Sequence, residues 1–238
     1  MLILSIDTAG ASGSVALCKC GADGRDCELL EIVSLAGRTY SAQLMPQISA
    51  LLARHNFDKS AIDGYVAASG PGSFTGLRVG LSTVKALAEI TQKPIAAVSL
   101  LEAMAWAGVD RGSLQSNSHS DLPVIAALDA MRGEVYVGEY VIVESALPKL
   151  QREVLMPLQE FAAEMQVAPN MPVVTTDESI ATALRERGAE VRVAPRPQSD
   201  VIARLGAMKI AAGHVTSPEA LDANYIRRSD AEIFSKQT

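Results

Sequence analysis

The residues with the most chemical potential form a glycine-rich stretch, GPGSFTGLRVG, at positions 70–80. Such a turn between a strand and a helix can hold a phosphate, because the free amides at the helix start point at the anion. A Walker A loop requires Gly, four residues, then Gly, Lys and Ser or Thr, but Gly76 follows Gly72 after three residues and precedes Leu77. A dinucleotide fingerprint requires glycine at position 75, which is threonine. The stretch therefore satisfies neither nucleotide motif.

Two interpretations of the stretch remain. In the first, the turn at Gly70, Gly72 and Ser73 keeps a residual anion site at the start of the helix. In the second, the first two glycines allow a tight turn, while Gly76 and Gly80 let the helix lie close to a neighbouring element. We favour the second interpretation and expect no bound nucleotide.

A second phosphate signal stands at the N-terminus, where the strand ILSID runs into Thr8 and a series of small residues that ends at Gly13. Actin-like ATPases and sugar kinases hold a phosphate and a metal ion with an acidic residue placed before such a hairpin. An Asp-Thr pair before small residues is also a good plain turn. Asp7 and Thr8 are therefore candidates for the vestige of an anion or nucleotide site.

Other catalytic arrangements are weaker. The three histidines are far apart in sequence and form no His-x-x-x-His pair, and no Gly-x-Ser-x-Gly elbow is present. Asp129, Arg132 and Glu134 cluster around a predicted turn, where alternating charges usually form a solvated face. We expect no catalytic residue in this chain.

Three cysteines, Cys18, Cys20 and Cys27, lie close together in the sequence. A structural zinc site needs four ligands, and no fourth cysteine or nearby histidine completes the set. An odd count without a secretion signal suits reduced thiols in a cytosol. We expect free thiols, no metal and no cofactor.

Composition limits the class of protein. The 238 residues are 48% hydrophobic and 20% charged, as in a folded protein of one or two domains. The net charge of −6 argues against a protein that wraps nucleic acid by bulk electrostatics. Without a secretory signal or an apolar run long enough to cross a bilayer, a soluble cytoplasmic protein with no membrane partner is expected.

Hydrophobic patterning predicts a three-stranded meander in the first half, followed by strands that alternate with helices. Its strands are predicted at 2–7, 13–20, 28–35, 65–69 and 95–98, and its helices at 41–55, 76–91 and 100–106. Pro46 is awkward inside the first helix, which should begin near Met45 or kink.

After polar residues 110–121, which fit a linker, the second half repeats the plan. Its strands are predicted at 124–129, 134–143, 152–155, 173–175 and 190–193, with a turn at 131–133, and its helices at 158–165, 178–187 and 200–212. The order of elements predicts an α/β fold of two duplicated lobes.

Six segments of the sequence resemble the TsaB (YeaZ) family, whose members take part in making N6-threonylcarbamoyladenosine (t6A) in bacterial tRNA. They are residues 3–17, 40–52, 69–88, 98–105, 128–140 and, weakly, 224–227. The resemblance implies the reduced two-lobed actin/Hsp70-like (ASKHA, ribonuclease H-like) fold, each lobe a mixed sheet with flanking helices. The N-terminal lobe would span 1–109 and the C-terminal lobe 122–238, with the last helix packing back on the first lobe.

The resemblance also implies a function. Family members look like non-catalytic scaffold or dimerisation subunits that bind and support TsaD, the catalytic subunit that modifies adenosine 37 of tRNAs reading ANN codons. The ATPase TsaE joins the assembly, tRNA reaches it through the complex, and the subunit alone forms a homodimer. The alternative is a small actin-like ATPase or sugar kinase acting alone. One departure is Tyr40, which stands where the family usually has a histidine.

The predicted partner interface combines the two helices at 41–55 and 76–91. An interface helix needs apolar anchors beside small residues that allow close approach. The interface residues expected on these grounds are Leu44, Ile48, Leu51, Gly76, Arg78, Gly80, Thr83 and Leu87.

Overall fold

The computed structural model describes residues 1–37, 39–108, 121–143, 146–167 and 171–227. The chain forms two compact units, of which the first combines Met1–Ala103 with Pro197–Ala223. The second combines Met104–Arg196 with Asn224–Thr238. Nearly all of the linker expected at 110–121 lies outside the described residues.

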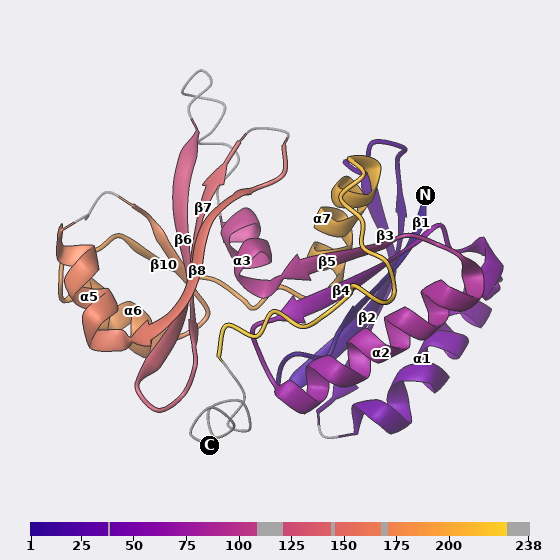
Figure 1. The fold of residues 1–238 in the computed structure, drawn as a ribbon, viewed down its shortest axis with the longest axis horizontal. Coiled ribbons are helices and arrows are strands. Elements are labelled where there is room, and N and C mark those ends of the chain that lie inside the picture. Colours follow the sequence, from indigo (N-terminus) through magenta and orange to yellow (C-terminus); the bar gives the residue numbers. More distant parts are fainter. Residues whose placement is uncertain (38, 109–120, 144–145, 168–170, 228–238) are drawn as a thin grey trace. The chain divides into compact units, whose positions relative to one another are not determined.

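The first unit contains a five-stranded sheet in the order β3-β2-β1-β4-β5 (Figure 1). Its strands are β1 (Leu2–Asp7), β2 (Ser12–Cys20), β3 (Cys27–Ala36), β4 (Gly64–Gly70) and β5 (Ile95–Ser99). The first three strands pair antiparallel, whereas β4 and β5 run parallel to β1. The predicted meander followed by crossovers is confirmed.

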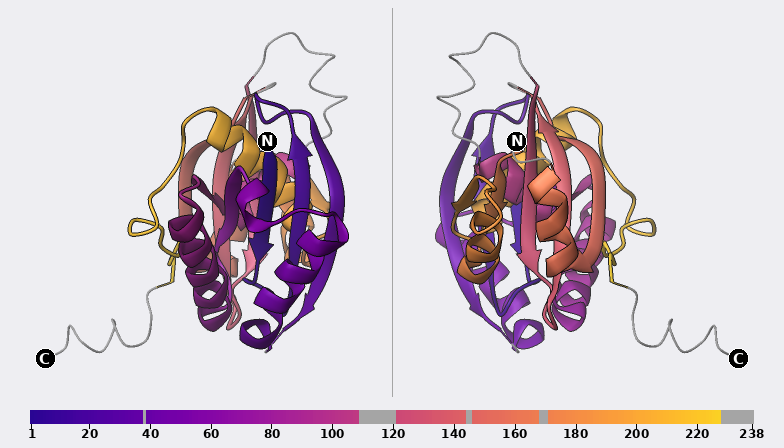
Figure 2. Two further views of the ribbon diagram at one scale, coloured as in Figure 1. Left: turned by 90° about the vertical axis from the view of Figure 1, so that its right-hand side faces the viewer. Right: turned by 90° about the vertical axis from the view of Figure 1, so that its left-hand side faces the viewer.

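The central strand β1 is buried along its whole length, because helices cover both faces of this sheet. They are α1 (Tyr40–Arg54), α2 (Phe74–Thr91) and α7 (Ser199–Ala211), and a short 3-10 turn, η1, spans Lys59–Ala61. Gly80 of α2 packs near Ile6, whereas Gly206 of α7 packs on Val66. Since Val66 is paired with Ser5, it points to the face opposite Ile6. Helices α1 and α2 therefore share one face and α7 covers the other (Figures 1 and 2).

Buried polar contacts fix α7 to the sheet. Ser199, at the start of α7, donates from its amide to the Ser14 hydroxyl at 3.0 Å and from its own hydroxyl to the Ser14 carbonyl at 2.6 Å. Further along, Lys209 pairs with Glu102 of α3 (Leu100–Gly108) at 2.6 Å and donates to the Ala97 carbonyl at 3.0 Å. The Ser14–Ser199 bonds are buried and the Lys209–Glu102 pair is partly buried, so each of these polar groups has a partner, as buried polar atoms require.

The second unit contains a sheet in the order β10-β9-β6-β7-β8. Its strands are β6 (Leu122–Asp129), β7 (Glu134–Ile142), β8 (Lys149–Pro157), β9 (Val173–Thr175) and β10 (Val191–Val193), and its helices are α5 (Leu158–Val167) and α6 (Glu178–Arg185). Phe161, Leu184 and Val135 belong to its buried core. The strand order and directions repeat those of the first sheet. The ribonuclease H-like arrangement thus occurs twice, and the predicted two-lobed α/β fold is confirmed.

The helix predicted at 41–55 is present as α1, which runs from Tyr40 through Pro46 to Arg54, so the later start considered near Met45 is wrong. Proline removes the amide that would bond the Ala42 carbonyl, and because both residues are exposed, water can serve that carbonyl instead. The expectation of three free thiols also fails, since Cys20 and Cys27 form a disulfide and only Cys18 is free. These two cysteines face each other across the β2–β3 pairing, which sequence spacing alone does not reveal.

Candidate functional site

The N-terminal hairpin that resembles a phosphate loop is buried in the protein itself. Asp7 closes β1, and its carboxylate accepts a hydrogen bond from the Ala9 amide at 2.9 Å. The Thr8 hydroxyl donates to the Gly76 carbonyl of α2 at 2.7 Å. Both side chains are almost fully inaccessible to water. Each therefore has an internal hydrogen-bond partner in the place where a phosphate-binding hairpin would face its ligand.

The glycine-rich turn closes against this hairpin. The Ser73 amide donates to the Ala9 carbonyl at 2.7 Å, and the Ser73 hydroxyl caps α2 by accepting from the Gly76 amide at 3.2 Å. A Cβ placed on Gly72 would overlap the Ala9 carbonyl oxygen, and one on Gly76 would overlap that of Thr8. These glycines allow two segments of one chain to touch. The close-approach interpretation of the turn accounts for both of them.

Gly80 has the same environment one turn further along α2. A Cβ at this position would overlap the Thr8 hydroxyl and would lie 3.5 Å from Ile6 Cγ2. The neighbour that the small residues of α2 approach is thus the chain's own N-terminal hairpin.

Tyr40 closes the hairpin from its other side. Its hydroxyl donates to the Gly10 carbonyl at 2.8 Å, and its ring would lie 2.9 Å from a Cβ on Gly13. Tyr40, which stands where the family usually has a histidine, is therefore buried and packs against the hairpin. Together, the hairpin, the turn and Tyr40 form what we call the closed loop pair: residues 7–13, residues 70–76 and Tyr40.

The closed loop pair brings together the residues predicted as an anion vestige. Asp7, Thr8 and Gly70 are buried, while Gly72 and Ser73 are exposed at the turn. Gly70 has a φ of 116° at the end of β4, a conformation that favours glycine. In the described structure, hydrogen bonds join these two loops to each other.

Most of the predicted interface residues face inward. Six of the eight are buried in the first unit, and they are Leu44, Ile48, Leu51, Gly76, Gly80 and Leu87. Thr83 is partly exposed, and Arg78 is exposed. Helices α1 and α2 touch each other and the sheet through the buried residues.

The outer face of these helices carries side chains that the apolar stripes did not include. Met45 of α1 is 45% exposed and Phe74 of α2 is 38% exposed. The Arg78 guanidinium stacks over the Phe74 ring, 3.8 Å from its centroid, in a cation–π contact. We call Met45, Phe74, Arg78 and Thr83 the outer helix face. Met45 and Phe74 could have been found in the sequence, because each is a large apolar residue beside the buried apolar face of its helix.

The other candidate groups do not converge on a catalytic set. Asp129 accepts from the Met131 amide in the turn, and Glu134 pairs with Arg227. His55 lies 2.9 Å from Glu31, whose pKa is held below its usual value mainly by the hydrogen bond from Arg54. Within the described ranges, no three His, Cys, Asp or Glu side chains are placed to hold a metal ion. His119 lies outside those ranges.

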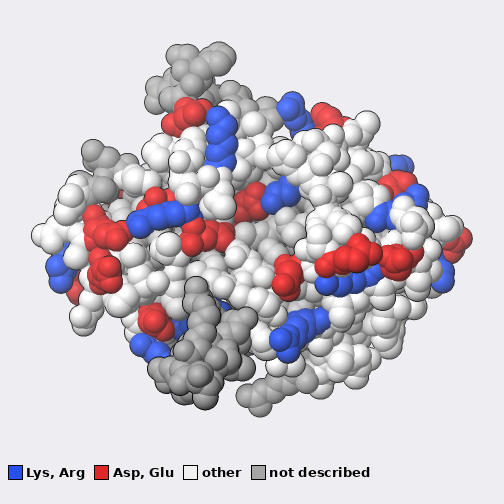
Figure 3. Space-filling view, viewed as in Figure 1, with Lys and Arg blue, Asp and Glu red and all other residues white. Residues whose placement is uncertain are grey.

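The surface and the helices add two facts. On the face seen in Figure 3, acidic and basic side chains are interspersed rather than gathered into one basic patch. In the parts of the chain that the structure describes, none of the helices combines the length and apolar character needed to cross a bilayer.

Comparison with known proteins places these features in a family. Residues 33–205 match the sequence model of the family described as "TsaD: tRNA N6-adenosine threonylcarbamoyltransferase". The chain is also 34% identical over 140 residues to the tRNA threonylcarbamoyladenosine biosynthesis protein TsaB of Bacillus subtilis (strain 168), which covers 59% of this chain and 55% of that protein. The protein of the same name from Escherichia coli (strain K12) gives the same identity and coverage. These matches span about half the length of the curated relatives.

Solved structures agree over a longer span. A Pseudomonas aeruginosa protein described as uncharacterized with similarity to peptidase YEAZ superposes with a TM-score of 0.73 and 25% identity, covering 95% of this chain and 99% of that chain. A second structure, YeaZ from the same organism, shares the fold with a TM-score of 0.72 and 24% identity, over 94% of this chain and 99% of that one. Since the family model covers well over half of the sequence, the chain belongs to the TsaD family, and its 34% identity to curated TsaB proteins assigns it to the TsaB (YeaZ) members of that family.

Proposed function

We propose that this chain is a non-catalytic subunit that binds and supports a TsaD-type catalytic subunit during t6A synthesis on adenosine 37 of tRNAs that read ANN codons. The names of its curated relatives and the matching family model support the pathway. The proposal includes TsaE as a further member of the assembly, tRNA reaching it through the complex, and a cytoplasmic location. It also includes a homodimer of this chain when the catalytic subunit is absent.

The observation that carries the proposal is the closed loop pair. A phosphate bound at the start of a helix lies against backbone amides that are free to point at it. Here the Thr8 hydroxyl, the Ser73 amide and the Tyr40 hydroxyl bond to backbone groups of the opposing segments. The hairpin and the turn thus hydrogen-bond to each other and to α1 and α2, and we propose that they position these two helices.

The partner surface we propose is the outer helix face on the N-terminal lobe, residues 1–109. An exposed aromatic residue with a stacked arginine suits a protein interface, because aromatic residues and arginine are enriched among side chains that dominate binding energy. Leu44, Ile48 and Leu51 act behind this face by holding α1 on the sheet, and Gly76, Gly80 and Leu87 do the same for α2.

The other function that the resemblance left open is a small ATPase or sugar kinase acting alone. It has less support, since the hairpin and turn it would use already bond to each other. Isothermal calorimetry with ATP at millimolar concentration should give no binding heat. Saturable heat, or ATP hydrolysis by the isolated protein, would favour this alternative over the subunit.

The decisive experiment is a binding titration against the TsaD-type subunit from the same organism. The variant Met45→Arg/Phe74→Glu changes two exposed side chains, so the fold should persist while affinity falls at least about 30-fold, as expected for the loss of about 2 kcal/mol at a hot spot. The control is Val215→Arg, because Val215 is 49% exposed, close to the 45% of Met45, and belongs to neither α1 nor α2. Equal affinity of all three proteins would contradict the proposed surface, and no binding by any of them would contradict the proposed function.

A further inference from the structure

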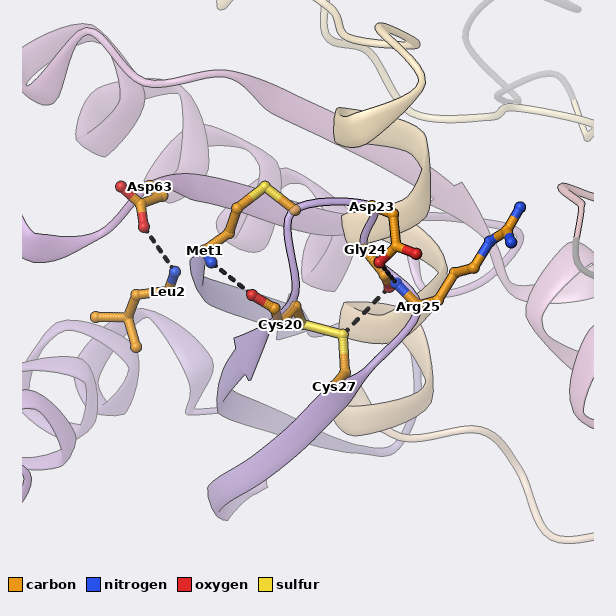
Figure 4. Close-up of a disulfide and its surroundings, with 8 residues drawn as sticks. All are labelled: Met1, Leu2, Cys20, Asp23, Gly24, Arg25, Cys27 and Asp63. Carbon is orange, nitrogen blue, oxygen red and sulfur yellow. Dashed lines mark hydrogen bonds between the residues drawn. A yellow bond between two sulfur atoms is a disulfide. The ribbon is translucent and has the colours of Figure 1, made fainter.

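The disulfide between Cys20 and Cys27 joins the last pair of residues in the β2–β3 hairpin (Figure 4). The two residues lie directly opposite each other in the register, so the bond closes the loop of residues 21–26. Cys20 is 4% exposed, whereas Cys27 is partly exposed. Both line a surface hollow of about 650 Å³, together with Lys19, Gly21, Arg25, Asp26 and Glu28. Cys27 is therefore the more exposed residue of the pair.

Backbone contacts hold the Cys20 side of the bond in place. The N-terminal ammonium of Met1 donates to the Cys20 carbonyl at 2.5 Å (Figure 4), and the Cys20 amide donates to the Met1 carbonyl at 2.8 Å. Cys27 belongs instead to β3, the edge strand of the sheet. Opening the disulfide would leave Cys20 anchored and free Cys27.

The loop that the disulfide closes rests on α7. Gly24 has a φ of 74°, and a Cβ on it would overlap the backbone of Ala207. This contact joins a hairpin near the start of the chain to a helix that arrives after residue 196. The state of the cysteine pair is thereby linked to the seating of α7 on the sheet.

We propose that Cys20 and Cys27 form a reversible thiol–disulfide exchange site, opened by a protein dithiol of the thioredoxin class. A thiolate of the reductant attacks the accessible Cys27 Sγ, the Cys20–Cys27 bond breaks, and Cys20 leaves as a thiolate that takes up a proton. The second thiolate of the reductant then attacks its own sulfur in the mixed disulfide and releases Cys27, which is protonated in turn. Two electrons pass to the cysteine pair, and the reductant ends as a disulfide.

The geometry also accommodates the reduced state. Cys27 Sγ lies 3.4 Å from the Gly24 carbonyl oxygen, so a thiol at Cys27 has an acceptor within its own loop. Reduction should loosen residues 21–26 without breaking the strand pairing, because the hydrogen bonds of β2 and β3 continue beyond this end.

Cys18 supplies an internal control. It is fully buried, and burial together with the charge of Asp200 raises the pKa of its thiol to about 11. Thiolates are the reactive form, so Cys18 should resist alkylation while the protein is folded. Trypsin separates the three cysteines, since cleavage after Lys19 and after Arg25 leaves one in each of peptides 1–19, 20–25 and 26–38.

The test treats the oxidised full-length protein with thioredoxin, thioredoxin reductase and NADPH, followed by N-ethylmaleimide without denaturant, trypsin and mass spectrometry. We expect the linked 20–25/26–38 peptide pair to disappear within minutes and both peptides to carry the label, with peptide 1–19 labelled only after denaturation. The Cys18→Ser variant should behave identically. Hydrogen exchange in residues 21–26 and at Ala207–Met208 should rise on reduction and should be equally high in the Cys20→Ser/Cys27→Ser variant.

Two results would overturn the proposal. In the first, the linked peptide pair survives the thioredoxin system and is reduced only in denaturant, which would make the disulfide a structural cross-link. In the second, the pair never forms, even when the protein is incubated with glutathione disulfide. Neither result bears on binding to the catalytic subunit, so this proposal and the proposed function can fail separately.

Discussion

Gly80→Ala should destabilise the protein only while Thr8 is present. A Cβ at position 80 would overlap the Thr8 hydroxyl, which donates to the Gly76 carbonyl at 2.7 Å. Overpacking costs about 1–3 kcal/mol, and loss of the hydrogen bond costs about 1 kcal/mol. Alanine in place of a helical glycine returns about 1 kcal/mol. We therefore expect a net loss of about 1–3 kcal/mol in the free energy of unfolding.

In a Thr8→Ala background the same substitution should become neutral or stabilising by up to about 1 kcal/mol. The next atoms that the new Cβ would meet, Ile6 Cγ2 and Thr8 Cβ, lie at 3.5 Å, which is ordinary van der Waals contact. Urea denaturation of the four proteins in a double-mutant cycle gives the coupling energy, expected at about 2 kcal/mol.

A control on the same helix separates packing from helix propensity. Ser82 of α2 is exposed, so Ser82→Ala should change stability by the same small amount in both backgrounds. The reasoning predicts different losses of unfolding free energy for Gly80→Ala in the natural and the Thr8→Ala backgrounds. If the two losses agree within about 0.5 kcal/mol, the conclusion that Gly80 packs directly against the Thr8 hydroxyl is refuted.

Three further predictions concern buried groups. Tyr40→Phe removes the hydrogen bond to the Gly10 carbonyl and should lower the free energy of unfolding by about 1 kcal/mol in urea, whereas an unchanged midpoint would mean that the hydroxyl is dispensable. Ser14→Ala leaves the buried Ser199 amide without its side-chain acceptor and should cost about 1–3 kcal/mol, with faster amide exchange at the start of α7. Burial raises the pKa of Cys18 to about 11 from the ordinary value of 9.0, so the folded state holds the proton more tightly. The contribution of the Cys18 thiol to the free energy of unfolding is therefore fully present below about pH 9 and falls by about 2–3 kcal/mol as the pH rises to 11. The Cys18→Ala variant should show a shallower decline of stability over this range.

Strong periodicity made most of the fold predictable. Strands β1 and β9 have the predicted bounds, and α2 begins two residues before the predicted start because Ser73 caps it. The turn at Met131–Gly133 was predicted from its residues and has positive φ at all three positions. Local preference and tertiary packing agree at these places.

The candidate site was less predictable because periodicity reports which face of a helix is apolar, not what covers it. Leu44 and Ile48 were selected by that signal, and they are buried against the chain's own sheet. Substitutions there would test folding, so the interface stays a prediction that only exposed residues such as Phe74 can test. The pairing of Cys20 with Cys27 depends on hairpin register, and the closing of the loops by Tyr40 joins segments about 30 residues apart.

The discontinuous first unit has a consequence for how the protein is made. Strand β5 ends at Ser99, and α7, which covers one face of its sheet, begins at Ser199. At about 5–20 residues per second, the ribosome needs about 5–20 s to synthesise the intervening segment. During that interval the apolar side chains of Ile3 and Val66 on the α7 face have no cover from this helix. A nonsense mutation anywhere in this interval would yield a chain without α7, in which these apolar side chains lack the cover of that helix.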